Sequence, residues 1–387
     1  MADPGAAGRI VGIDVARCLA LLGMMATHLL EPITGADEVA TSHAVASGRA
    51  SGLFALLAGV SLALVTGGSR VHEGRRLGAD RAGIAVRAAV IAFLGLLLGG
   101  LPTNIAIILV YYAVLFVMAL PFLGLGWRPL ALLAAAWAVA GPVAGMLLRR
   151  DLASPARLVP SLEHLATPLE LAQSLLLTGY YPAIGWFAYL LAGLAVGRLD
   201  LRRASVAARV AVAGAVLAVV TWVVSVDVTG DAAVRRALLR SDDGGATTWE
   251  ELRRQLDLGS YGTTPTDSWW WLVPIGPHSG TALTLLHTIG CSLAVVGVAV
   301  LAARVLPRLW AVVLGAGAMT LTLYSLHIVM LTPEVPPAEE PSAYLPQVLV
   351  VLAVGAAYAL ARRRGPLEYL VAELSRSAAR AVGRRTP

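Results

Sequence analysis

The chain has 387 residues, of which 57% are hydrophobic and only 14% are charged, and its mean hydropathy is +0.74. A soluble domain carries about a quarter charged residues, so this composition excludes an ordinary soluble enzyme and indicates a polytopic membrane protein. Every one of the 30 basic residues is arginine, and the net charge of +6 favours the lipid bilayer, with its anionic surface, over nucleic acid as a partner. Heavy use of Ala, Gly, Leu and Val suggests a GC-rich bacterial genome.

The start of the chain and its two cysteines give no sign of a secreted, disulfide-bonded protein. The opening MADPGAAGRI is short and poor in basic residues, which is not typical of a cleaved signal peptide. Cys18 and Cys291 both fall in apolar segments, so no disulfide framework is expected. The first apolar segment is therefore expected to remain as a membrane anchor.

Apolar segments recur along the chain at lengths that suit a bilayer, since about 20 apolar residues cross a hydrocarbon core of about 30 Å. They predict an all-α bundle of about ten transmembrane helices. The expected spans are 11–30, 50–67, 82–100, 104–123, 129–148, 182–198, 205–225, 281–303, 309–331 and 344–361. The sixth is short, and LAQSLLLTGYYP upstream is available to extend it.

Arginines gather in alternate connections between these spans, and arginine-rich loops mark the cytoplasmic side. The arginine-bearing set holds Arg9, Arg70, Arg75, Arg76, Arg81, Arg128, Arg198, Arg202, Arg203, Arg304 and Arg308, and the tail adds Arg362, Arg363, Arg364, Arg376, Arg380, Arg384 and Arg385. The opposite set begins with EPITGADEVATSHAVASG and ends with TPEVPPAEEPSA, and neither stretch contains arginine. This alternation predicts cytoplasmic N- and C-termini in the plasma membrane.

Two long outer loops and the basic tail lie outside the predicted spans. Arg149, Arg150 and Arg157 open the loop 149–181, and long loops translocate regardless of charge. The loop 226–280 contains Trp269–Trp271, interpreted as an interfacial belt or, alternatively, as an aromatic platform for an acceptor. Residues 1–364 are expected to form one membrane domain, and the basic tail 365–387 to form an amphipathic helix on the inner leaflet.

The first span, IDVARCLALLGMMATHLLE, carries Asp14, Arg17 and His28 on one helical face. Arg17 and His28 lie about 20° apart around the helix and Asp14 and His28 about 40°. Ionisable groups in a membrane almost always face a bundle interior or a wet cavity, so the face predicts a polar seam. Asp14 and Arg17 are then either a neutralised pair that locks helices together or part of a site, and His28 is either a buried structural histidine or a general base.

Asp14-Val-Ala-Arg17, an apolar run and then His28 resembles the first catalytic helix of the transmembrane acyltransferase superfamily. The rest of the chain is similar to its heparan-α-glucosaminide N-acetyltransferase-like branch in bacterial form. The supporting stretches are SGRASGLFALLAGVSLAL at 47–64, TGYYPAIGWFAYLLAGLAVGRLDL at 178–201, GPHSGTALTLL at 276–286 and GAMTLTLYSLHIVML at 317–331.

The resemblance implies transfer of an acyl group, with acetyl expected, from cytoplasmic acyl-CoA to a hydroxyl or amine of an envelope glycan or glycolipid on the outer side. It also allows a homodimer. Cys18 stands where the family's motif has glycine. The histidine of the heparan-type branch sits in the loop after the first span, where His43 is the match, so His28 and His43 are both candidate bases, with His28 preferred.

Three further residues are candidate substrate contacts. Arg49 could bind a phosphate or a developing oxyanion or could be an interface arginine; His278 could line an acceptor entrance or be a loop histidine; His327 could join the seam or serve packing. The histidines are scattered without metal-ligand spacing, so no metal is expected.

Two other functional classes stay open from sequence alone. A transporter or flippase also places ionisable groups within the membrane, although no inverted repeat is evident. A degenerate family member would bind acceptor without cleaving the donor. Acyl transfer at His28, with Asp14 and Arg17 organising the cytoplasmic end, is the preferred hypothesis. It could proceed by direct transfer, with His28 as the proton acceptor, or through an acyl-histidine intermediate.

Overall fold

The structure, a computed structural model, describes residues 9–152, 158–241 and 245–384. The expectations about the chain before Arg9, about Arg157 and about Arg385 concern residues outside these ranges. Within them the fold is all-α, with a single isolated β-bridge between Ile33 and Val39 as the extended pairing. The predicted fold class is confirmed, and the chain is an integral, multi-pass membrane protein.

Seven helical segments of the described chain are long and apolar enough to cross a membrane. They contain α1 (Val11–Leu29), α2 and α3 (Thr41–Ala46, Arg49–Val65), α4 (Gly74–Leu98), α6 (Trp127–Arg149), α9 (Ala204–Gly230), α12 (Ala282–Ala302), and η7 with α15 (Pro341–Ala343, Tyr344–Leu360). An eighth candidate is the bent pair formed by α7 (Pro168–Gln173) with the π-helical turn η4 (Ser174–Thr178) and α8 (Ala183–Gly197), which meet at 58°. This is the sixth predicted span together with the upstream stretch expected to extend it.

Seven or eight of the predicted spans thus meet the length and composition of a membrane-crossing helix in the described chain, and the other two contain shorter apolar helices. In 104–123 the chain is irregular until α5 (Leu109–Ala119) and η2 (Leu120–Gly124), and the amide groups of Asn104 are held by Glu339 at 2.7 Å. The segment 309–331 is divided into α13 (Pro307–Val313), η6 (Gly315–Ala318) and α14 (Thr320–Met330). Gly317 explains this break, because its lack of a side chain lets η6 pack directly on the α1 backbone at Asp14.

Helices of the bundle approach closely where small residues face each other, as is common in membranes. A Cβ added at Gly59 of α3 or Gly193 of α8 would collide with the backbone of the opposite helix. Gly214 of α9 and Gly290 of α12 form a second such contact. These contacts pair α3 with α8 and α9 with α12, and α12 in turn contacts α3 and α8 around the polar residues described below.

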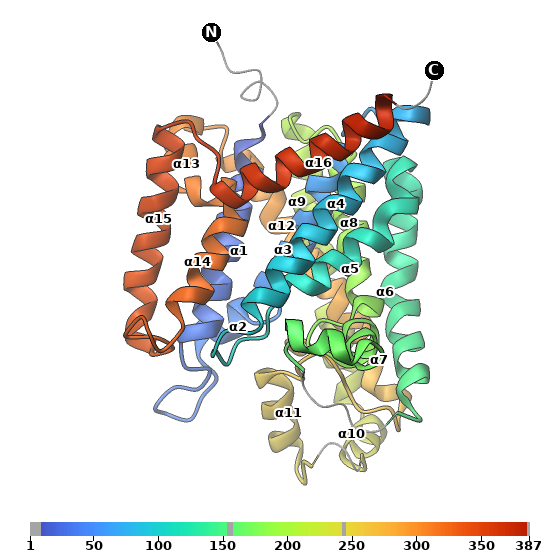
Figure 1. Cartoon of the computed structure of the whole chain (residues 1–387). Coiled ribbons are helices and arrows are strands. Elements are labelled where there is room, and N and C mark those ends of the chain that lie inside the picture. The colour runs from blue at the N-terminus through green and yellow to red at the C-terminus, as the bar shows by residue number, and fades with distance from the viewer. Residues whose placement is uncertain (1–8, 153–157, 242–244, 385–387) are drawn as a thin grey trace.

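A second, smaller core lies beyond one end of the bundle, at the bottom of Figure 1. It is built from buried residues of α10 (Ala232–Leu239), α11 (Trp249–Leu258) and η5 (Trp269–Leu272), together with Met146 of α6. The sequence of α11 begins with a capping box in which Thr248 and Glu251 satisfy each other's backbone N–H groups. Trp271 is buried in this core, whereas Trp269 and Trp270 are exposed.

The start of α1 and the C-terminal helix α16 (Pro366–Arg384) lie at the same end of the bundle, opposite α10 and α11 (Figure 1). The helix α16 crosses this end and packs along α4. Its Glu368 carboxylate accepts hydrogen bonds from the backbone N–H groups of Leu321 and Thr322, at 2.7 and 3.1 Å, and from the Thr322 hydroxyl at 2.6 Å. The carboxylate thereby caps the first turn of α14, where helical N–H groups otherwise have no partner.

Candidate active site

The polar face predicted for α1 is present and engages its neighbours. Arg17 Nη1 donates to Asp14 Oδ1 at 2.8 Å, and Arg9 Nε donates to Asp14 Oδ2 at 2.5 Å. Arg17 Nη2 donates to Ser61 Oγ of α3 at 2.6 Å. Asp14 is only 5% exposed, so its charge is neutralised by two guanidinium groups rather than by solvent.

Close packing survives the cysteine at the family's glycine position. Cys18 is fully buried on α1, and a Cβ at Gly317 would lie 3.0 Å from its backbone nitrogen. The small side chain is accommodated because η6 contributes glycine at the point of contact.

His28 meets His327, although the two are 299 positions apart in the sequence. His28 Nδ1 and His327 Nε2 are 3.0 Å apart, and the two rings are nearly parallel, at 4°. On its other side, His327 Nδ1 lies 2.7 Å from Gln347 Oε1 of α15. His327 is fully buried and Gln347 is 6% exposed, whereas His28 is half-buried. The chain of polar groups therefore runs from a buried amide to a partly accessible imidazole.

A cavity of about 390 Å³ lies on the α16 side of this histidine pair, and we call it the α16-side cavity. Its polar lining groups are Arg17, Ser61, Arg87, Tyr112, Thr320, Tyr324 and Glu368, and the remainder is mostly apolar. Arg17 forms an ion pair with Asp14, and the Glu368 carboxylate accepts hydrogen bonds from α14. Among the described residues, Arg87 of α4 forms no ion pair. The cavity thus combines a positively charged part with a long apolar wall.

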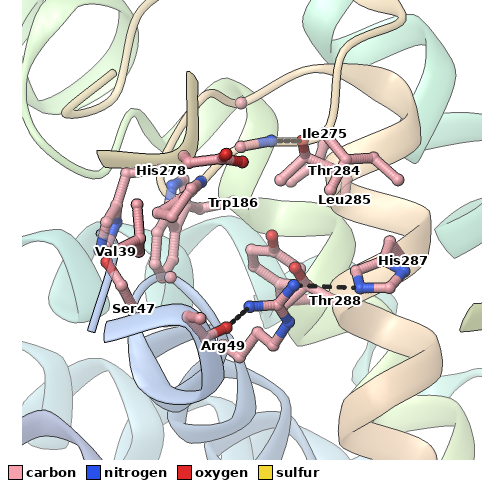
Figure 2. Close-up of a pocket in the computed structure, with 17 residues that line it drawn as sticks. Val39, Ser47, Arg49, Trp186, Ile275, His278, Thr284, Leu285, His287 and Thr288 are labelled. Carbon is pink, nitrogen blue, oxygen red and sulfur yellow. Dashed lines mark hydrogen bonds between the residues drawn. The ribbon is translucent and has the colours of Figure 1, made fainter. Parts of the chain in front are cut away.

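A second cavity, of about 220 Å³, opens beside α11, and we call it the α11-side cavity. Its lining includes Ser47, Arg49, Trp186, Tyr189, Asp257, His278, Thr284, His287 and Thr288. Figure 2 shows Arg49 reaching toward His287 and Thr288 of α12, with Trp186 and His278 side by side across the cavity. None of the three tryptophans at 269–271 lines it, so the aromatic-platform alternative gains no support from the structure.

Arg49 is held at the floor of this cavity by backbone and imidazole groups. It donates to the Ala44 carbonyl, and its Nη2 lies 3.4 Å from His287 Nε2. Asp257, near the end of α11, lines the same cavity, and its carboxylate lies 3.9 Å from Arg253 Nε. The cavity therefore presents one fixed cation and one acid.

His278 and His43 occupy the α11 side of the molecule. His278 adopts a positive φ of 53° in its turn, stacks on Trp186 at 6.1 Å between ring centroids, and meets Tyr181 edge-on. Burial, with a smaller effect of His43, lowers the pKa of His278 to about 4, so the imidazole is neutral at physiological pH. His43 Nε2 lies 3.1 Å from the Leu258 carbonyl, which can only accept, so this nitrogen carries the proton.

The histidine pair lies between the two cavities. Met24, one turn before His28, and Tyr324, one turn before His327, both line the α16-side cavity. On the opposite side, a Cβ at Gly23 of α1 would lie 3.0 Å from Ala50, the residue after Arg49 of the α11-side cavity. No residue lines both cavities within the described ranges.

The structure therefore brings the candidates together in three groups. Asp14 and Arg17 lie at the α16-side cavity, His28 and His327 form the central pair, and Arg49 and His278 line the α11-side cavity. His43 lines neither cavity but adjoins Leu258 of α11. Sequence reasoning missed Ser61, Arg87, Asp257, Gln347 and Glu368 as site residues. Arg87 alone carried a signal, as an arginine inside a predicted span.

The described parts of the chain contain no group of three or more His, Cys, Asp or Glu side chains that could hold a metal ion. The expectation of metal-free chemistry stays a prediction.

The bundle and its cavities define a multi-pass membrane protein with polar sites on both sides of a central histidine pair. Residues 9–228, more than half of the chain, match the model of the family described as heparan-alpha-glucosaminide N-acetyltransferase, catalytic. The chain therefore belongs to this family, as the sequence motifs predicted. Membership implies acetyltransferase activity, for which the family uses acetyl-CoA as donor. A search among curated proteins gave no match.

Proposed function

We propose that the protein transfers an acetyl group from cytoplasmic acetyl-CoA to a hydroxyl or amine of an envelope glycan or glycolipid on the outer side of the plasma membrane. The observation that carries this proposal is the position of the His28–His327 pair between two separate cavities, in a chain that belongs to an acetyltransferase family. Transfer between substrates on opposite sides needs a proton acceptor at such a point.

The α16-side cavity is the proposed donor site. Arg87 and Arg17 supply cationic groups for the phosphates of the coenzyme, since guanidinium groups suit bidentate phosphate binding. The apolar wall, with residues such as Phe54, Leu57 and Phe116, suits the pantetheine arm and the acetyl group. The thioester would then lie near Met24 and Tyr324, next to the histidine pair.

The α11-side cavity is the proposed acceptor site. Arg49, Asp257 and the Thr284 and Thr288 hydroxyls offer both donors and acceptors to a sugar. Trp186 and Tyr189 provide the aromatic faces on which a pyranose ring can stack.

In the proposed reaction, the acceptor oxygen or nitrogen attacks the thioester carbonyl as His28 takes its proton. The C–S bond breaks, and the protonated His28 returns that proton to the departing CoA sulfur. Asp14 and Arg17 organise the donor end. The same orientation places α16 and the start of α1 in the cytoplasm, with residues 365–387 as a helical tail against the membrane domain.

The test is release of CoA and transfer of radiolabelled acetyl groups from acetyl-CoA by detergent-purified protein, with an envelope glycolipid extract as acceptor. We expect the wild type and a His164→Ala control to be active and His28→Ala to be inactive. If His43→Ala alone is inactive, the loop histidine is the base. If the wild type releases no CoA thiol, the proposal fails and the transporter hypothesis is favoured.

A further inference from the structure

The orientation of the Gln347 amide determines where its neighbours carry their protons. Gln347 Nε2 donates to the Met330 carbonyl at 3.2 Å, which directs Oε1 toward His327. A carbonyl oxygen can only accept, so His327 Nδ1 must carry a proton to fill the 2.7 Å contact. In a neutral imidazole the other nitrogen is then unprotonated, which makes His327 Nε2 an acceptor.

The same reasoning extends to His28. Its Nδ1 lies 3.0 Å from His327 Nε2, so Nδ1 must be the donor in the neutral pair. His28 Nε2 is left with its lone pair free. His28 is also the only one of these three side chains that is not buried, so the proton-accepting nitrogen sits at the accessible end of the chain of hydrogen bonds.

We propose that Gln347 and His327 are positioning residues that hold His28 as the Nδ1–H tautomer, with Nε2 presented to the acceptor substrate. This inference deepens the proposed function and rests on it for the reaction, although the tautomer itself does not depend on activity. When Nε2 takes the acceptor's proton, the imidazolium is stabilised by donation from Nδ1 to His327, which in turn donates to the Gln347 dipole. The proton then leaves with the CoA sulfur, and the pair returns to its starting state.

The first measurement is ¹⁵N NMR of histidine-labelled wild-type protein in detergent, with the His28→Gln variant used to assign the signals. Protonated and unprotonated ring nitrogens have well-separated shifts, so the tautomer is read directly. We expect His28 to show a protonated Nδ1 and an unprotonated Nε2. A protonated Nε2 in the neutral ring would overturn the proposal, whatever the activity of the protein.

The second measurement compares Gln347→Leu, Gln347→Glu and the exposed control Gln255→Leu in acetyl transfer. Because a wrong tautomer removes the base, kcat should fall by about 10²-fold or more in Gln347→Leu. The KM for acetyl-CoA should stay unchanged. Gln347→Glu should restore most of kcat, since a carboxylate also accepts from His327 Nδ1.

These outcomes separate the two proposals. An unchanged kcat in Gln347→Leu, or equal losses in the Leu and Glu variants, would overturn the positioning role. A wild type that shows the expected tautomer but transfers no acetyl group would overturn the proposed function, while the tautomer of His28 set by Gln347 and His327 would remain supported.

Discussion

Asp14, Arg17 and His28 share one face of α1, from which Arg17 contacts Ser61 of α3 and His28 contacts His327 of α14. His327 was a candidate for the seam from the sequence, but its pairing with His28 and its contact with Gln347 arise only through the packing of α14 and α15. No local pattern in the sequence joins residues 299 positions apart. The shared face of α1 was therefore predictable from the sequence, whereas the pairing of residues from different helices was not.

Arg87 gives a direct test of the donor cavity. Replacing it with leucine should raise the KM for acetyl-CoA by about tenfold to about a hundredfold, since a hydrogen bond to a charged group contributes about 1.5–3 kcal/mol. Steady-state kinetics with varied acetyl-CoA measures the effect. Arg209→Leu, an exposed arginine of α9, is the matched control and should leave KM unchanged. Equal KM values for Arg87→Leu and wild type would remove Arg87 from the donor site.

His278 should make the stability of the protein depend on pH. Its folded pKa of about 4 lies below the ordinary value of 6.5, so the unfolded chain takes up a proton in this window that the folded protein does not. The contribution of His278 to the free energy of unfolding should therefore be largest above pH 6.5 and should fall as the pH drops toward 4. Thermal melting across this range should show a shallower decline in His278→Asn than in wild type. If the melting temperatures of wild type and His278→Asn fall in parallel with pH, the lowered pKa of His278 is contradicted.

The helix α16 packs on α4, and its expected position on the inner leaflet of the membrane stays a prediction. Its amphipathic pattern was visible in the sequence, but a pattern does not say whether lipid or protein covers the apolar face. In the structure Ser375 and Ala379 of α16 lie against Gly83 of α4, whereas Leu370 and Leu374 of the apolar face are exposed. Val371 lines the α16-side cavity, and Glu368 caps α14. The breaks at 101–108 and 315–318 were likewise missed, because they depend on close contacts such as that of Gly317 with α1.

Loss of the Glu368 carboxylate should loosen α16. Glu368→Ala removes three hydrogen bonds to α14 and should lower the free energy of unfolding by about 1–3 kcal/mol. Trypsin should also cleave after the arginines of α16 more quickly than in wild type. Glu373→Ala, which removes an exposed ion pair with Arg376 on the same helix, should cost about 0–1 kcal/mol. Similar effects for both variants would argue against the cap.

At the scale of the whole molecule, the alternation of arginine along the sequence predicted that the two ends of the chain share one side. The start of α1 and α16 do lie at one end of the bundle (Figure 1). The same alternation predicted that both long loops lie on the opposite, outer side. It could not show that they fold over a core of their own and supply Asp257 and His278 to a cavity.

Labelling can establish the orientation in the membrane. In a Cys291→Ala background, where the remaining Cys18 is fully buried, a cysteine at exposed Ser342 should react with a membrane-impermeant maleimide added to intact cells. A cysteine at exposed Ser377 of α16 should react only after the cells are permeabilised. The reverse pattern would invert the proposed sidedness of both cavities.

The separation of the two cavities has a consequence for the cell that houses this protein. A membrane that stores a proton gradient loses it through any continuous file of water. Here a histidine pair and the packed helices around it divide the two cavities, which share no lining residue in the described chain. Under the proposed function, substrates approach from opposite compartments while the packed helices between the cavities stay closed to water, and only the small acyl group passes.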